Sequence, residues 1–209
     1  MKLNEVTRGY FDKMSGIEKG QDAADFKAIL QSTPDAAALA RLSATPLYNA
    51  MLRTTCVATM VNGGHALNAL PQRVTANVNC RVLPGEDPQE VQRTLVRVIG
   101  DPKIAVTAVE PAKPSPPSPL TPRIMDTITR VTEEMWPGVA VVPVMSTGAT
   151  DGLYFRQAGV PIYGVSGLFG DMDDVRAHGR DERMGVKDFY DGQEFLWWVV
   201  TTLSGARRG

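Results

Sequence analysis

The sequence predicts an α/β protein in two parts: a small two-layer α/β domain, then part of a mostly parallel sheet covered by helices on both faces. Three observations support this prediction. Segments rich in β-branched residues lie at 51–61 and 73–83, and a helix with clear start and stop signals follows at 87–100. Beyond residue 122, short apolar segments alternate with helical ones.

The first 48 residues are expected to be helical and irregular. The segments DAADFKAIL (22–30) and DAAALARL (35–42) each open on an aspartate that is able to cap a helix. Both place apolar residues at helical spacing. We find no pattern of catalytic or binding residues in this part of the chain.

The next elements form the small α/β domain. Two strands are joined by the long connection NGGHALNALPQ, and the following helix is expected to start at Asp87 and Pro88 and to end at Gly100. KIAVTAVE (103–110) alternates as a third strand. The order strand, strand, helix, strand describes most of a two-layer domain.

A proline-rich segment divides the chain. EPAKPSPPSPLTP, residues 110–122, contains six prolines, which do not belong in a helix interior or a central strand. We therefore expect one domain over residues 1–110 and another over residues 111–209.

The second domain is expected to build a parallel sheet. Helices are predicted at 120–136, 153–159 and 186–203, and apolar strands at 139–145 and 160–168. The polar loop STGATDG follows the first of these strands, and the loop with His178 follows the second. Ligand sites in such sheets lie at the carboxyl ends of the strands, where both loops begin.

Charge and hydropathy exclude several classes of function. Net charge is −1, with 22 basic and 23 acidic residues spread along the chain, so neither a nucleic-acid partner nor an anionic membrane is predicted. No apolar run approaches the roughly 20 residues that span a bilayer. The N-terminus has no apolar signal region, which predicts a cytoplasmic protein if Met1 is the true start; a secreted or periplasmic protein is the alternative if a signal precedes it.

The two cysteines, Cys56 and Cys80, are too few for a disulfide framework and form no CxxC pair. We expect two free, buried thiols in strands, because free cysteine is among the most buried residue types. The alternative is that they face each other across a hairpin.

His178 is the candidate metal ligand that the residues themselves suggest, because it follows a strand and precedes a glycine. One histidine does not make a zinc site, and the chain has no HxxxH, HxD or CxxC pattern. Arg81 ends a strand, where it is either a carboxylate-binding residue or a salt-bridged surface arginine. A metal-free hydrolase that uses Ser146 or Thr147 with His178 and Asp151 is a distant alternative, since no GxSxG elbow is present.

Three motifs in order resemble the co-catalytic di-zinc peptidases, the family of glutamate carboxypeptidase, aminoacylase, carnosinase-type dipeptidases and succinyl-diaminopimelate desuccinylase. They are GGHALNALPQRVTANVNCRVLPGED, GATDGLYFRQAGVPIYGVSG and AHGRDERMGVKDF. The version RTTCVATMVNGG is most similar to the carboxypeptidase S and N-acyl-amino-acid hydrolase branch.

The resemblance implies a fold and roles for particular residues. The fold would be a partial, ferredoxin-like lid domain and the C-terminal part of an α/β/α metallopeptidase catalytic domain, with homodimerisation through the lid sheet. The complete enzyme would hold two zinc ions, and His178 resembles the ligand to the second. Arg81 resembles the residue on the substrate carboxylate and Asn68 one near the scissile carbonyl, while Gly148 and Asp151 resemble residues that line the cleft.

The chain also departs from the family pattern. The HxD motif, the bridging aspartate and the paired glutamates are absent, and His65 stands at the wrong place in the order to be the lid histidine. We therefore expect no catalytic residue in this chain. It is expected to be the C-terminal part of a zinc-dependent hydrolase of peptide or N-acyl-amino-acid amide bonds, inactive alone. The alternative is a truncated, non-catalytic homologue that acts as a dimerisation module.

Overall fold

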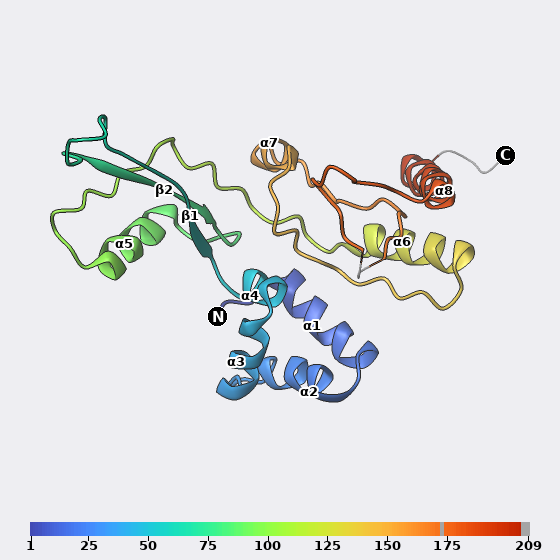
Figure 1. The fold of residues 1–209 in the computed structure, drawn as a ribbon. Helices are drawn as coiled ribbons and strands as arrows, with labels where there is room; N and C mark the ends of the chain where they lie inside the picture. The colour runs from blue at the N-terminus through green and yellow to red at the C-terminus, as the bar shows by residue number, and fades with distance from the viewer. Residues whose placement is uncertain (172–173, 206–209) are drawn as a thin grey trace. The chain divides into compact units, whose positions relative to one another are not determined.

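The computed structural model describes residues 1–171 and 174–205, which form two compact units (Figure 1). One unit contains Met1–Ser118 together with Pro143–Pro161, and the other contains Pro119–Val142 and the described residues from Ile162 onward. The mixed α/β class is confirmed. None of the described helices combines the length and the hydropathy needed to cross a membrane.

Four helices open the first unit: α1 (Glu5–Ile17), α2 (Gly20–Ile29), α3 (Ala36–Ala44) and α4 (Pro46–Leu52). The expected cap at Asp35 is confirmed, since its side chain accepts a hydrogen bond from the Ala38 amide at 2.7 Å. The expected cap at Asp22 is wrong. Helix α2 begins two residues earlier, which places Asp22 in the first turn, where its charge favours the helix dipole.

The four helices enclose one hydrophobic core. Its buried members are Phe11, Phe26, Ile29, Ala38, Leu42, Met51 and Leu52. Met51 and Leu52 were expected to open a strand, but both are fully buried at the end of α4. Burial of these two side chains against the helices stabilises the helical end more than their propensity favours a strand.

A buried ion pair joins α2 to α3. Arg41 donates two hydrogen bonds to Asp25, from Nε at 2.8 Å and from Nη2 at 2.6 Å, and Gln21 donates a third at 2.8 Å. The Asp25 side chain is buried, whereas that of Arg41 is half exposed. The bonds from Arg41, helped by the one from Gln21, lower the pKa of Asp25 although burial opposes this.

Replacing Asp25 by asparagine is expected to lower the free energy of unfolding by about 2 kcal/mol near neutral pH, the contribution of hydrogen bonds to a charged group. The folded-state pKa lies below its ordinary value of 3.8, so this contribution is present above pH 3.8 and is lost as pH falls through the lowered pKa. Urea unfolding from pH 7 down to pH 2 checks this, with Asp12→Asn, an exposed position, as control. A difference between wild type and Asp25→Asn that stays constant with pH would contradict the prediction.

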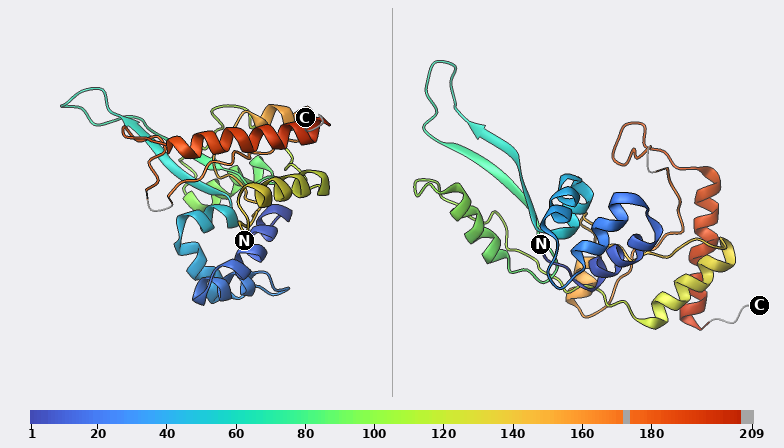
Figure 2. Two further views of the ribbon diagram at one scale, coloured as in Figure 1. Left: turned by 90° about the vertical axis from the view of Figure 1, so that its right-hand side faces the viewer. Right: turned by 90° about the horizontal axis from the view of Figure 1, so that it is seen from below.

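Strands β1 (Thr55–Gly63) and β2 (Val74–Arg81) form an antiparallel hairpin, the only sheet within the described residues (Figure 2). Successive residues of a strand point to opposite faces. The register therefore gives the hairpin one apolar face, with a bulge between Ala58 and Met60. This face, called the apolar hairpin face below, consists of Cys56, Ala58, Val61, Val74, Ala76, Val78 and Cys80. Most of it is exposed.

The expectation of two free, buried thiols is wrong. Cys56 and Cys80 are register partners, with Cα atoms 4.1 Å apart, and they form a disulfide. Cys56 is exposed and Cys80 half-buried, and Cys56 lines a hollow rather than a packed core. The disulfide forms because the strand register places the two cysteines directly opposite each other.

Helix α5 (Pro88–Ile99) confirms the expected start and stop signals. The Asp87 side chain accepts a hydrogen bond from the Gln89 amide, Pro88 is the first helical residue, and Gly100 ends the helix with a φ of 65°. The strand expected at 103–110 does not form. The Val106 carbonyl accepts a hydrogen bond from the Gln92 side chain instead of a neighbouring strand.

The strands expected at 139–145 and 160–168 are also absent from the structure, so no parallel sheet forms within the described residues. Pro143 and Pro161 lack the N–H that a ladder requires. A buried parallel strand also needs neighbours on both sides, and the hairpin is the only strand pair described.

Helices α6 (Pro122–Met135) and α8 (Val186–Ser204) pack against each other in the second unit through Val131, Phe195 and Val199. Residues 162–168 run close to α8 because Gly192 has no side chain. A Cβ atom there would lie 2.5 Å from Leu168 Cδ2 and 3.0 Å from the Ser166 carbonyl oxygen. Helix α7 (Gly152–Gln157) belongs to the first unit.

Candidate functional site

His178 lies in an exposed loop that precedes α8. The Gly179 amide donates to the Arg176 carbonyl at 2.9 Å, which closes a turn with His178 at its third position. The φ of His178 is 65°, the one left-handed value at a non-glycine residue of the described chain. Type II turns have such a φ at this position and favour glycine or asparagine there. The loop therefore presents the imidazole on a turn of disfavoured backbone conformation.

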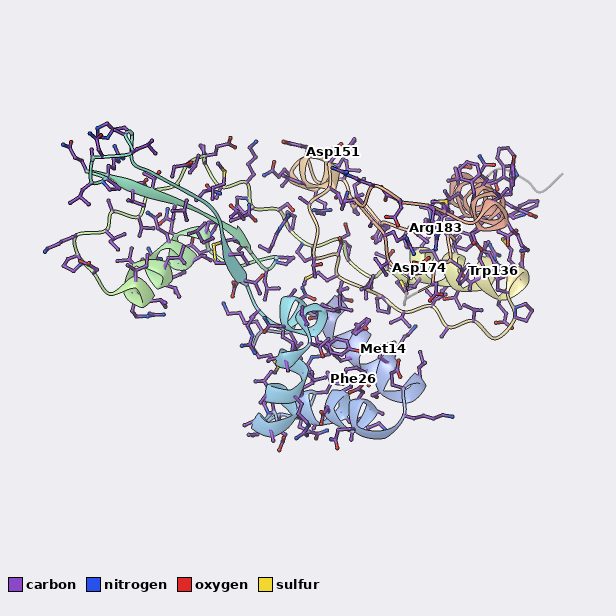
Figure 3. All side chains as sticks on the ribbon, viewed as in Figure 1. Met14, Phe26, Trp136, Asp151, Asp174 and Arg183 are labelled. Atoms are coloured by element: carbon purple, nitrogen blue, oxygen red, sulfur yellow. A yellow bond between two sulfur atoms is a disulfide. The ribbon has the colours of Figure 1, made fainter. Side chains whose placement is uncertain are left out.

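Four charged side chains surround this turn. Arg176 Nε donates to Asp174 Oδ1 at 2.5 Å, and Arg183 Nη2 donates to Asp174 Oδ2 at 2.5 Å (Figure 3). Arg176 also donates to Asp181. The hydrogen bond from Arg183 and then that from Arg176 lower the pKa of the Asp174 carboxyl, so it is ionised at neutral pH.

These ion pairs bear on metal binding. A ligating histidine commonly donates its second N–H to a carboxylate. Asp174 and Asp181 are instead bonded to arginines. No group of three or more histidine, cysteine or acidic side chains able to hold a metal exists among the residues that the structure describes. These residues do not by themselves fit a zinc site, which takes three or four protein ligands.

Asn68 and Arg81 lie at opposite ends of the hairpin. Asn68 is in the loop between the strands, and Arg81 is the last residue of β2, opposite Thr55. The seven steps from Val74 to Arg81 along this strand span about 23 Å at about 3.3 Å per residue. Both side chains are exposed, and no ion pair among the described residues includes Arg81. The hairpin does not bring these two predicted substrate-binding residues together.

Gly148 and Asp151 lie in the segment before α7, and both are exposed. The Gly148 amide donates to Ser146 Oγ at 3.2 Å, so this hydroxyl is engaged with the local backbone. Asp151 precedes α7, although its side chain makes no capping hydrogen bond (Figure 3). The roles of these two residues and of His178 stay predictions.

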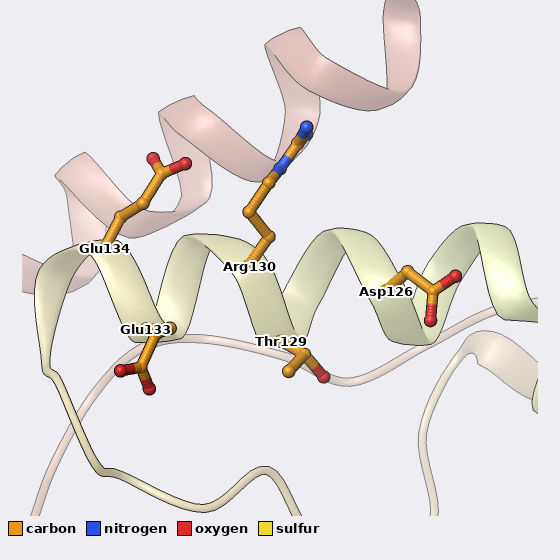
Figure 4. A pocket seen from close by; sticks show the side chains of 5 residues that line it. All are labelled: Asp126, Thr129, Arg130, Glu133 and Glu134. Carbon is orange, nitrogen blue, oxygen red and sulfur yellow. The ribbon is translucent and has the colours of Figure 1, made fainter.

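Two hollows occur elsewhere on the described surface. One, of about 460 Å³, is lined by Asp126, Thr129, Arg130, Glu133 and Glu134, all from α6. Their side chains spread along the helix and do not converge on a common point (Figure 4). A set of charged side chains on one exposed helix face gives no convergent geometry for catalysis.

The second hollow, of about 610 Å³, lies between the start of β1 and α5 and was not anticipated from the sequence. Glu86 is its central polar residue. It accepts hydrogen bonds from Thr54 and from Lys2, the latter at 2.6 Å, and the Leu83 amide donates to Thr54 at 2.9 Å. Burial favours the neutral form of Glu86, but the bonds from Lys2 and Thr54 outweigh it and lower the pKa. This network ties the chain start to the base of the hairpin.

The first unit combines a helical segment, a disulfide-linked hairpin and a capped amphipathic helix. Residues 17–107 match the M20 peptidase dimerisation domain, which confirms the resemblance seen in the motifs. Over these residues the chain is similar to the peptidase dimerisation domain of the M20 family.

Curated relatives match the chain beyond this domain. The probable carboxypeptidase S-like protein 2 of Dictyostelium discoideum is 26% identical over 164 residues, 76% of this chain and 31% of that protein. The human N-fatty-acyl-amino acid synthase/hydrolase PM20D1 is 26% identical over 159 residues, covering 74% and 32%. The Xenopus tropicalis protein of the same name is 30% identical over 148 residues, covering 68% and 28%. The chain thus spans about a third of the length of these relatives.

A solved structure shares the fold. The M20 family metallo-carboxypeptidase Sso-CP2 from Sulfolobus solfataricus superposes with a TM-score of 0.59 at 15% identity, over 97% of this chain and 46% of that one. Because the identity is low, this similarity describes the fold alone.

Proposed function

We propose that this chain is part of a zinc-dependent hydrolase that cleaves peptide or N-acyl-amino-acid amide bonds. The observation that carries the proposal is the order of features along one chain: a peptidase dimerisation domain at 17–107, then the GATD segment, then the His178 loop. Relatives named carboxypeptidase S-like protein and N-fatty-acyl-amino acid synthase/hydrolase match across this range.

Within this proposal the chain supplies one metal ligand and several substrate contacts. His178 contributes an imidazole to one of two zinc ions, whose remaining ligands lie outside this chain. Arg81 binds a substrate carboxylate, for which a guanidinium is suited because it donates two parallel hydrogen bonds. Asn68 lies near the scissile carbonyl, and Gly148 and Asp151 line the cleft.

The isolated 209-residue chain is expected to bind less than one zinc ion per molecule and to release no amino acid from an N-acyl amino acid. A single histidine cannot replace the three or four ligands that a tight zinc site requires. Metal analysis after dialysis, together with an assay of amide hydrolysis, checks both points. Stoichiometric zinc with turnover would contradict this expectation.

The second candidate function is a non-catalytic dimerisation module, and the exposed apolar hairpin face favours it. Contiguous exposed apolar surface commonly marks an interaction site. Both candidates predict a homodimer through the hairpin sheet. The DNA that encodes the residues upstream of Met1 separates them: an in-frame HxD motif with paired glutamates supports the hydrolase, and a stop codon supports the module.

Val78→Asp is expected to weaken the homodimer at least about 100-fold, because a buried unpaired charge costs several kcal/mol. Val78 is on the apolar hairpin face, whereas its neighbour Asn79 points to the opposite face. Asn79→Asp therefore introduces the same charge as a matched control and is expected to leave the dimer intact. Analytical ultracentrifugation measures the dissociation constants. Equal effects of the two variants, or a wild-type monomer at all concentrations, would exclude this face as the interface.

The disulfide supports a proposal on localisation. Disulfides persist mainly in oxidising compartments and are rare in the cytosol. Of the two alternatives drawn from the sequence, a secreted or periplasmic location is therefore the one we propose. Quantifying the Cys56–Cys80 disulfide by mass spectrometry in protein from its native source, alkylated before lysis, tests it.

A further inference from the structure

One carboxylate connects the two ends of the His178 loop. Asp174 lies four residues before the histidine and binds Arg176 on the same side and Arg183 on the far side, each at 2.5 Å. Arg176 also binds Asp181. The network thus encloses residues 174–183, and His178 lies between its two ends.

The ion pairs of this network differ in how much of the loop they span. The bond from Arg176 to Asp181 encloses only the turn, whereas the bond from Arg183 to Asp174 spans the whole loop, and the bond from Arg176 to Asp174 connects the two. The loop has little else to hold it, because residues 177–183 are exposed and form no helix or strand. A left-handed conformation at His178 persists only where the surrounding structure enforces it.

We infer that Asp174 is a positioning residue, which holds the His178 turn in its left-handed conformation by binding Arg176 and Arg183 at once. The inference rests on the proposed function for its purpose, which is to orient the imidazole, but the contacts themselves do not depend on zinc. Gly179 is part of the same arrangement. A Cβ atom at this position would lie 3.0 Å from the Arg176 carbonyl oxygen and 3.1 Å from Asp181 Oδ1, so the turn leaves little room for a side chain beside the Asp181 carboxylate.

Hydrogen–deuterium exchange of the 209-residue chain tests the inference. In Asp174→Asn, peptides covering residues 174–183 are expected to exchange about five-fold faster, the effect of losing two exposed ion pairs. Arg183→Gln breaks only the bond that spans the whole loop and is expected to give a smaller increase. Asp126→Asn, on α6 in the same unit, removes a carboxylate elsewhere and is expected to leave the loop unchanged. Unchanged exchange in α6 and α8 shows that each variant is folded. Equal loop exchange in wild type and Asp174→Asn would overturn the inference.

A zinc titration followed by NMR separates this inference from the proposed function. The chain has two histidines, so the imidazole signals of His178 are read against His65 as an internal reference. The titration uses the chain extended by its upstream residues, because the 209-residue chain alone is expected to hold no tight zinc. If zinc leaves His178 unperturbed in that extended wild type while Asp174→Asn loosens the loop, the ligand role fails and the positioning role stands. If zinc perturbs His178 equally in both proteins and loop exchange is unchanged, the positioning role fails and the ligand role stands.

Discussion

Replacing Phe26 by alanine is expected to lower the free energy of unfolding of the helical segment by about 4 kcal/mol, the largest effect of any substitution considered for this chain. Phe26 is fully buried where α1, α2 and α4 meet (Figure 3). Its ring lies 5.4 Å from that of Phe11 and 5.2 Å, edge-on, from that of Tyr48. Truncation removes these contacts and leaves a cavity that rigid helices fill only in part.

Urea unfolding followed by circular dichroism measures this effect, because the segment is helical. Leu47→Ala provides a control in the same segment, since Leu47 is 44% exposed and its truncation opens no cavity. The control is expected to change stability by well under about 1 kcal/mol. A similar loss in both variants would show that the aromatic cluster is not the centre of this core.

Reducing the Cys56–Cys80 disulfide is expected to destabilise the hairpin by about 3.5 kcal/mol, as the chain-entropy relation gives for a loop of this length. The two cysteines are 24 residues apart and close a loop that contains most of the hairpin. Isolated two-stranded hairpins are marginally stable, and the described residues add no third strand to this one. The disulfide therefore holds together a sheet that has little other support.

Hydrogen–deuterium exchange with and without dithiothreitol localises the effect to β1 and β2. The double variant Cys56→Ser/Cys80→Ser is expected to match the reduced wild type and to be insensitive to reductant. Exchange in α1–α4 serves as the internal control, because the helical core contains no cysteine. Two titratable thiols in the unreduced protein would show that the disulfide is absent in solution.

Features that depend on near neighbours in the chain were predictable. Asp87, Pro88 and Gly100 delimit α5 through hydrogen bonds and backbone angles within a few residues of each end. The end of α7 near Gly159 and the extent of α8 follow the same local rules. The order of three motifs likewise predicted the similarity to M20 peptidases, since order along the chain is itself a property of the sequence.

Local sequence pattern did not predict the structure of the apolar segments at 139–145 and 160–168. Their composition predicts strands, but a strand exists only through hydrogen bonds to another strand, and none is provided by the described residues. Local composition also predicted a strand at Met51 and Leu52, which instead lie at the end of a helix. A core formed by three preceding helices decides that they end a helix.

Helix caps, periodicity and motif order are encoded within short stretches of chain. The ends of α5, the similarity to the M20 dimerisation domain and the candidate status of His178 could therefore be predicted from sequence alone. Three features became visible only in the folded chain: Cys56 faces Cys80, Asn68 and Arg81 lie at opposite ends of one hairpin, and Asp174 binds arginines on both sides of His178. Each of these depends on strand register or on loop closure. Both bring together residues whose separation in sequence carries no information about their distance in space.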